Sequence, residues 1–126
     1  FPGYPVVPGT LLIESMAQIL GYLGEISYEK EFCDTKGVYV LLTIIHRAKF
    51  RDYVIPGDQC ILKGRLKSLD KNRCSGSAEV YVNKKRMAEA ELSFIIIQQH
   101  MLPPNKYISK RDEYNHILTQ ERQRGT

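Results

Sequence analysis

One segment, from Thr10 to about Lys30, restricts the possible folds of this chain more than any other. Its apolar residues recur at the spacing of an α-helix but cover most of the helix circumference, instead of the single stripe of a surface helix. They are Leu11, Leu12, Ile13, Met16, Ala17, Ile19, Leu20, Leu23 and Ile26. Pro8 and Gly9 suit the start of such a helix, and Thr10 can cap it. A helix so apolar needs cover on nearly every side, so we expect it to be buried.

Most of the remaining chain changes from helical spacing to the two-residue repeat of β-strands. Short polar turns separate three segments in which apolar and polar residues alternate, namely 60–68 (CILKGRLKS), 77–82 (SAEVYV) and 88–94 (AEAELSF). These are the signals of antiparallel hairpins. Residues 37–45 (GVYVLLTII) are apolar almost without a break. Such a run predicts a central strand that is buried on both faces.

One long apolar helix followed by about four antiparallel strands indicates an α+β fold in which a curved sheet wraps around the helix. Such a sheet leaves one flank of the helix and its own edges uncovered, so we expect a dimer in which a second copy covers them. The length of 126 residues is enough for one domain, which we place at residues 1–102. Residues 103–126 form a polar C-terminal tail, which either contains a short surface helix or is mobile.

Charge and cysteine content argue against several classes of function. The formal net charge of +4 is spread along the chain, whereas nucleic-acid binding normally shows a denser basic stripe. The charge therefore indicates either mild attraction to an acidic partner or simple solubility. The three cysteines have no metal-binding or redox spacing, which is typical of reduced thiols in a cytoplasmic protein. No apolar run approaches the roughly 20 residues that a membrane-spanning helix needs.

The first charged residue of the apolar helix, Glu14, is the main candidate for chemistry. It either points to solvent or lies in an apolar pocket, where a carboxyl group can act as a general acid or hold a water. The Pro8–Gly9 start of the helix favours the second interpretation. The first N–H groups of a helix are unpaired and lie at the positive end of its dipole, so the Gly9 N–H could polarise a carbonyl oxygen.

Three separated sequence blocks are FPGYPVVPGTLLIESMAQ at residues 1–18, AKFRDYVIPGDQCIL at 48–62 and MAEAELSF at 87–94. In this order they resemble the FabZ-type 3-hydroxyacyl-[acyl-carrier-protein] dehydratases of fatty-acid synthesis. Together they cover roughly residues 1–98. The resemblance implies a hotdog fold, in which the sheet wraps the long helix. It also implies the dehydration of (3R)-3-hydroxyacyl thioesters to trans-2-enoyl thioesters, without a metal or redox cofactor.

The resemblance also implies roles for individual residues. Glu14 matches the carboxyl group that helps the C3 hydroxyl to leave, and Gly9 matches the amide that binds the thioester oxygen. The histidine that takes the C2 proton would stand immediately before Phe1, where this sequence begins, so we expect a truncated N-terminus. None of the three other histidines matches the motif. In this family the histidine of one subunit faces the carboxyl group of the other, which implies a homodimer, and three dimers often form a hexamer.

Further residues are candidates for substrate binding and docking. Gln18 lies one helical turn after Glu14, and either supports that carboxyl group or the nearby loop, or satisfies backbone groups at the dimer seam. Tyr39 and Phe50 either line or gate the acyl tunnel or pack in the core, and Pro8 adjoins the substrate at the helix start. The implied partner, acyl carrier protein, is acidic, so cations near the tunnel mouth should favour docking. The candidates are Lys36, Lys49 and Arg51.

Two other functions stay open at the level of the sequence. A hotdog thioesterase would hydrolyse the same class of thioester, and it too carries a carboxylate on or near the central helix. A non-catalytic acyl-binding subunit would keep the dimer and the tunnel but lack the histidine. The tight Pro-Gly pair before the helix favours the dehydratase.

Overall fold

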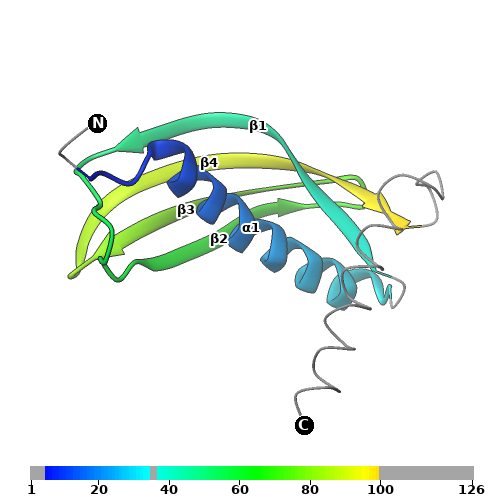
Figure 1. Ribbon diagram of the computed structural model, residues 1–126. Helices are drawn as coiled ribbons and strands as arrows, with labels where there is room; N and C mark the ends of the chain where they lie inside the picture. Colours follow the sequence, from blue (N-terminus) through cyan, green and yellow to red (C-terminus); the bar gives the residue numbers. More distant parts are fainter. Residues whose placement is uncertain (1–4, 35–36, 100–126) are drawn as a thin grey trace, which may run out of the picture.

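The computed structural model of the chain describes residues 5–34 and 37–99. Within them the chain forms one helix and four strands, α1 (Gly9–Phe32), β1 (Val38–Phe50), β2 (Ile61–Leu69), β3 (Arg73–Val82) and β4 (Lys85–Gln98). The strands make one antiparallel sheet in the order β1-β4-β3-β2. The sheet curves around α1, which lies along its concave face (Figure 1). The tail expected at residues 103–126 lies outside the described residues.

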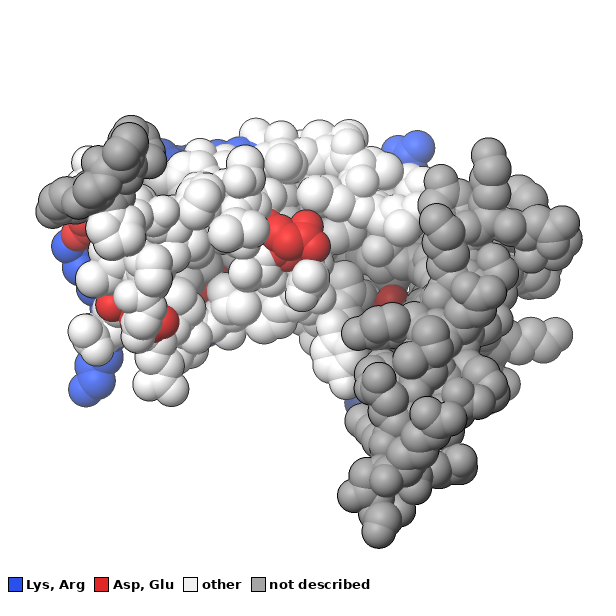
Figure 2. Space-filling model, in the orientation of Figure 1, with Lys and Arg blue, Asp and Glu red and all other residues white. Residues whose placement is uncertain are grey.

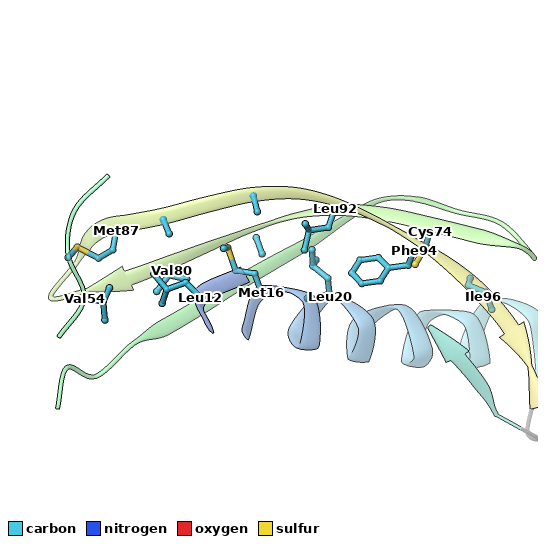
Figure 3. Packing of buried hydrophobic residues seen from close by; sticks show 14 of the residues in the cluster. Leu12, Met16, Leu20, Val54, Cys74, Val80, Met87, Leu92, Phe94 and Ile96 are labelled. Carbon is cyan, nitrogen blue, oxygen red and sulfur yellow. The ribbon is translucent and has the colours of Figure 1, made fainter. Parts of the chain in front are cut away.

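The core lies between α1 and the concave face of the sheet (Figure 3). The buried positions of α1 fall on one side of the helix: Leu12, Met16, Ala17, Leu20, Gly24 and Tyr28. Alternate residues of β3 and β4 are buried against them. A Cβ atom on Gly76 would be 3.0 Å from Leu20 Cδ2 and 2.5 Å from the carbonyl oxygen of Arg65. A glycine in β3 therefore lets the helix approach the sheet closely.

Both predicted hairpins are present. Between β2 and β3, the Asp70 carboxylate accepts hydrogen bonds from the backbone N–H groups of Asn72 and Arg73, at 2.7 and 2.8 Å. Between β3 and β4, Asn83 and Lys84 both have left-handed backbone angles, with φ of 50° and 66°. Such angles are those of a two-residue hairpin turn. The alternating segments of the sequence thus form β2, β3 and β4 as expected.

β1 differs from the expectation for the apolar run at residues 37–45. It forms a strand, but within the described residues it pairs only with β4 and so lies at an edge of the sheet. Its side chains include Leu41, Leu42, Ile44 and Ile45, which are 46%, 39%, 50% and 47% exposed. The prediction of a central, buried strand is therefore wrong for the single chain. An apolar run shows that both faces need cover, but not whether the same chain supplies it.

Helix α1 is likewise not buried on every side. Leu11, Tyr22 and Ile26 are exposed, at 54%, 66% and 45%. The sheet covers the opposite side of the helix, where the core residues lie. The expectation of a helix covered on nearly every side is thus wrong for one chain, and part of its apolar surface has no cover from the described residues.

Candidate active site

Helix α1 begins at Gly9, and no side chain caps its first turn. The carbonyl oxygen of Pro8 accepts hydrogen bonds from the N–H groups of Leu11 (3.0 Å) and Leu12 (3.4 Å). Thr10 lies inside the helix, so the prediction that it caps α1 is wrong. The amides of Gly9 and Thr10 precede these first donors and lie at the positive end of the helix dipole, where they can bind an oxygen atom.

A small cavity of about 210 Å³ adjoins the start of α1. It is lined by Val6, Val7, Gly9, Leu12, Phe50, Asp52, Tyr53 and Val54. The hydrogen bond from the Val7 N–H to the Val54 carbonyl oxygen, 2.7 Å, holds the segment before the helix against the loop after β1. Phe50 is half exposed and places its ring against Gly9. Two of the predicted site residues, Gly9 and Phe50, are therefore in contact.

Glu14 and Gln18 lie one helical turn apart on the open side of α1. Gln18 Nε2 donates a hydrogen bond to Glu14 Oε1 at 3.0 Å, which is one of the contacts expected for Gln18. Both side chains border a groove of about 420 Å³ between α1 and β1. The groove is lined by Glu14, Ala17, Gln18, Gly21, Tyr22, Glu25, Val40, Leu41, Leu42 and Phe94. Glu14 is exposed in the single chain, so burial within one chain does not remove its carboxyl group from water.

The face of the molecule that carries α1 is mostly uncharged (Figure 2). One compact acidic area lies near its centre, and the basic side chains visible in this view lie towards its margins. The groove has the same character: its charged lining residues are Glu14 and Glu25, and small or apolar residues of α1, β1 and β4 supply most of the remainder. A surface of this kind suits an apolar ligand with a polar reacting end.

The two candidate catalytic residues border different cavities. Gly9 lines the small cavity and Glu14 lines the groove. They are five positions apart on the helix, which corresponds to about 7.5 Å along its axis. The single chain thus holds the amide and the carboxyl group on one helix, but it does not enclose the space between them.

Tyr39 does not join this group of residues. Val38 is buried in the core and Val40 packs against it, so strand alternation places Tyr39 on the opposite face of the sheet. Accordingly, Tyr39 is not among the residues that line the groove or the small cavity. In the single chain, Tyr39 therefore does not line the groove that Glu14 borders.

The three predicted docking cations have different surroundings. Lys49 is exposed on β1, next to Phe50. Arg51 makes an ion pair with Glu89, with 2.8 Å between Nη2 and Oε1. The hydrogen bond from Arg51 is the main cause that lowers the pKa of the Glu89 carboxyl group. Arg51 is thus engaged within the chain, and Lys36 lies outside the described residues.

The described histidine, His46, lies away from the groove. It occupies an irregularity of β1 next to Ile45, and its Nε2 lies 2.5 Å from Ser93 Oγ. Ser93 alternates with the buried Leu92 and Phe94, so it faces away from α1. His100 and His116 lie outside the described residues. Within residues 5–34 and 37–99, therefore, no histidine is placed beside Glu14.

Sequence reasoning missed most of the groove. Gly21 follows Gln18 by three positions, and this spacing places both residues on the same face of the helix, so a signal for Gly21 was available. Val40 and Leu42 gave no such signal, because the sequence does not show that β1 lies beside this face of α1. The strand side of the groove becomes visible only in three dimensions.

In the part of the chain that the structure describes, no cluster of His, Cys, Asp or Glu side chains is arranged to hold a metal ion. The helix found there is not long and apolar enough to cross a membrane.

The sequence matches a known family over most of its length, since the FabA-like domain covers residues 1–91. The chain belongs to the FabA-like family. Similar curated proteins include the 3-hydroxyacyl-[acyl-carrier-protein] dehydratase FabZ of Enterococcus faecalis, 43% identical over 96 residues, or 76% of this chain and 64% of that protein. The FabZ dehydratase of Chlamydia trachomatis is 34% identical over 102 residues, or 81% of this chain and 65% of that protein. This FabA-like chain therefore spans just under two thirds of the length of these relatives.

Solved structures support the fold of this FabA-like chain. A hot-dog-like protein from Thermanaerovibrio acidaminovorans is similar with a TM-score of 0.64 and 11% identity, covering 88% of this chain and 73% of that one. A hexameric thioesterase from Yersinia pestis is similar with a TM-score of 0.59 and 19% identity, covering 79% of each chain. The predicted α+β hotdog fold, a long helix wrapped by a curved antiparallel sheet, is therefore confirmed.

Proposed function

We propose that this chain is the core of a dehydratase that converts (3R)-3-hydroxyacyl-[acyl-carrier-protein] thioesters to trans-2-enoyl thioesters in fatty-acid synthesis. Membership of the FabA-like family and the FabZ names of its relatives support the proposal. The observation that carries it is the position of Glu14. This carboxylate lies on the helix that begins at Gly9, is hydrogen-bonded to Gln18, and borders a largely apolar groove.

The reaction requires a base at C2 and a proton for the departing hydroxyl at C3. The base takes the C2 proton, the C3 hydroxyl leaves as water, and a double bond forms between C2 and C3. Glu14 supplies the proton to that hydroxyl, directly or through a water that it holds, while the Gly9 amide binds the thioester oxygen as negative charge develops there. The hydrogen bond from Gln18 fixes one carboxyl oxygen of Glu14 and so orients the other. The base is the histidine expected immediately before Phe1.

A second copy of the chain completes the site in this proposal. Strand β1 presents exposed apolar side chains at one edge of the sheet. The opposite edge, β2, carries exposed cations that discourage strand pairing, namely Lys63, Arg65 and Lys67. We therefore place the dimer at β1, where the second copy would shield Glu14 from water and bring its own histidine to the groove. Three such dimers would give the hexamer implied by the resemblance.

The partner in this proposal is an acidic acyl carrier protein of the cytoplasm. Lys49 adjoins Phe50, whose ring lies at the small cavity beside Gly9. Lys49 makes no ion pair within the described residues, so it can meet a carboxylate of the carrier without breaking a contact of its own. Arg51 could do so only by exchanging Glu89 for that carboxylate. Docking would therefore depend more on Lys49 than on Arg51.

A direct assay tests the proposed reaction. The chain, together with any residues that precede Phe1, is mixed with crotonyl thioester, and two signals are followed. Hydration removes the absorbance of the conjugated enoyl group, whereas hydrolysis releases a free thiol. We expect hydration without thiol release. Thiol release without hydration would identify a thioesterase, and binding without either signal would identify an acyl-binding subunit.

A further inference from the structure

Two glycines lie three positions apart in the middle of α1, and the packing of the fold explains only one of them. Gly24 is buried. A Cβ atom there would be 3.2 Å from Cys74 Sγ and 3.5 Å from Val40 Cγ1. Even the methyl group of an alanine at this position would require the Cys74 side chain to move by a few tenths of an ångström. The close packing of α1 against β1 and β3 therefore accounts for a glycine at position 24.

Gly21 has no comparable reason within the fold. The nearest atom to a Cβ on Gly21 is the carbonyl oxygen of Val40, at 3.9 Å, an ordinary contact distance. Glycine inside a helix lowers stability relative to alanine, because it loses more backbone freedom on folding and contributes no side chain. The chain thus accepts a weaker helix at a position where a side chain would fit. The missing side chain leaves open space in the groove, which Gly21 lines.

We propose that Gly21 sets the longest acyl chain that the groove accepts, an inference that rests on the dehydratase function proposed above. Gly21 follows Glu14 by seven positions, which is about 10 Å along the helix axis. If C3 of the substrate lies at Glu14, the single methyl group of a crotonyl chain stays close to that residue. The tail of a decenoyl chain, in contrast, extends along the groove to Gly21.

The surroundings of Gly21 suit a linear hydrocarbon chain. Between Glu14 and Gly21 the groove has the small side chain of Ala17 on the helix side. Val40, Leu42 and Phe94 contribute apolar surface from the sheet. A side chain on position 21 would project into this space and shorten it. The residue thus acts as a specificity determinant without touching the reacting atoms.

The test compares Gly21→Leu with the unchanged protein on crotonyl and trans-2-decenoyl thioesters. Leucine is a good helix former, so the substitution fills the groove without weakening α1. We expect kcat/KM for the decenoyl substrate to fall by about tenfold or more relative to that for crotonyl, in line with the discrimination that a filled apolar pocket provides. Ser27→Leu places the same side chain on the same helix away from the groove lining, and it should leave the ratio unchanged.

Two further measurements separate this inference from the proposed function. Calorimetry of decanoyl-pantetheine binding should show binding to the unchanged protein and a loss of about tenfold or more in Gly21→Leu, even if neither protein is catalytically active. Size-exclusion chromatography should show the same oligomer for both proteins. Equal losses for short and long chains, unchanged decanoyl binding, or dissociation of the oligomer by Gly21→Leu would each overturn the inference. The last result would mean that a second copy, not an acyl chain, occupies the groove.

Discussion

The ring of Phe50 lies directly against the backbone of Gly9. A Cβ atom on Gly9 would be 3.0 Å from Cζ and 3.1 Å from Cε1 of this ring, which is closer than the 3.5–4.0 Å or so that carbon atoms prefer. Phe50 is the last residue of β1 and Gly9 is the first residue of α1. The contact therefore joins the end of the edge strand to the end of the helix whose amides are free to bind an oxygen.

Replacement of Gly9 by alanine should separate the catalytic role of this position from its structural role. The added methyl group moves the Phe50 ring and blocks the approach of a thioester oxygen, so we expect kcat/KM to fall by about tenfold or more. Stability should fall by at most about 1 kcal/mol, since the half-exposed ring can move aside. When Phe50 is already alanine, the further change Gly9→Ala should no longer lower the melting temperature, because the ring that it would displace is absent. Turnover of this double variant should still be low. Wild-type turnover in Gly9→Ala would contradict the amide role.

Glu14→Gln should fold and assemble normally but lose most of its turnover. Glutamine keeps the size of the side chain and an oxygen that accepts the hydrogen bond from Gln18, but it cannot transfer a proton. We expect turnover to fall by a factor of about 10²–10⁴, measured as dehydration of a 3-hydroxyacyl thioester. Glu29→Gln, an exposed position on the same helix, is the matched control. Turnover of Glu14→Gln within a few fold of the unchanged protein would rule out this role.

Ile45→Lys should dissociate the proposed dimer. Ile45 pairs with Leu92, whose side chain faces α1, so Ile45 lies on the helix side of β1 while remaining 47% exposed. An ammonium group buried there without a partner costs several kcal/mol, so the dissociation constant should rise by about a hundredfold or more. Ile61→Lys, at a 55% exposed position on the opposite edge strand, is the matched control. Light scattering that shows equal effects of both changes would argue against a dimer at β1.

Thiol labelling should distinguish the three cysteines. Burial is the main cause that raises the pKa of Cys74 to about 11, and the nearby Asp70 charge adds to it. Cys33 and Cys60 are exposed. Because the thiolate is the reactive form, iodoacetamide at pH 8 should label Cys33 and Cys60 in the folded protein and all three cysteines after denaturation. Rapid labelling of Cys74 in the folded protein, read by peptide mass spectrometry, would show that its environment is not closed.

The Asp70 turn should make stability depend on pH in the acid range. Hydrogen bonds from the N–H groups of Asn72 and Arg73 hold the pKa of Asp70 below its ordinary value of 3.8. A carboxyl group whose pKa is lowered by folding stabilises the protein above its ordinary pKa, and this effect is lost as the pH falls towards the lowered value. Asp70→Ala should therefore lower the melting temperature at pH 7, and the difference should shrink below pH 3.8. An equal loss of melting temperature in Asp70→Ala at pH 7 and below pH 3.8 would show that the charge of Asp70 does not cause its effect.

The sequence was sufficient to predict those parts of the fold that depend on neighbouring residues. The helix expected from Thr10 to about Lys30 is Gly9–Phe32, and the alternating segment at residues 60–68 forms most of β2. In this strand Leu62 packs against the core, whereas Lys63, Arg65 and Lys67 are exposed. The spacing of residues along a helix or strand determines which side chains share a face, so this property can be predicted from the sequence of that element alone. The resemblance to FabZ-type dehydratases then supplied the hotdog architecture.

The position of β1 and the shape of the groove could not be predicted in this way. Val38 pairs with Gln98, a residue far along the chain, and no local pattern encodes such a partner. The same limit applies to Glu14. Its place in an apolar helix was visible in the sequence, but its exposure depends on whether a second molecule covers it. A periodic pattern of apolar residues shows that a face needs to be covered, but it does not show whether the same chain or a second molecule covers it.

The pairing of β1 with β4 also determines the stage of synthesis at which the apolar side chains of β1 are most exposed to aggregation. During synthesis β1 leaves the ribosome before the other strands, so its isoleucines and leucines have no neighbouring strand until β4 has emerged. The meander of β2, β3 and β4 is built from adjacent segments and closes only short loops. A chaperone that holds the nascent chain would therefore have its greatest effect between the synthesis of Phe50 and that of Gln98.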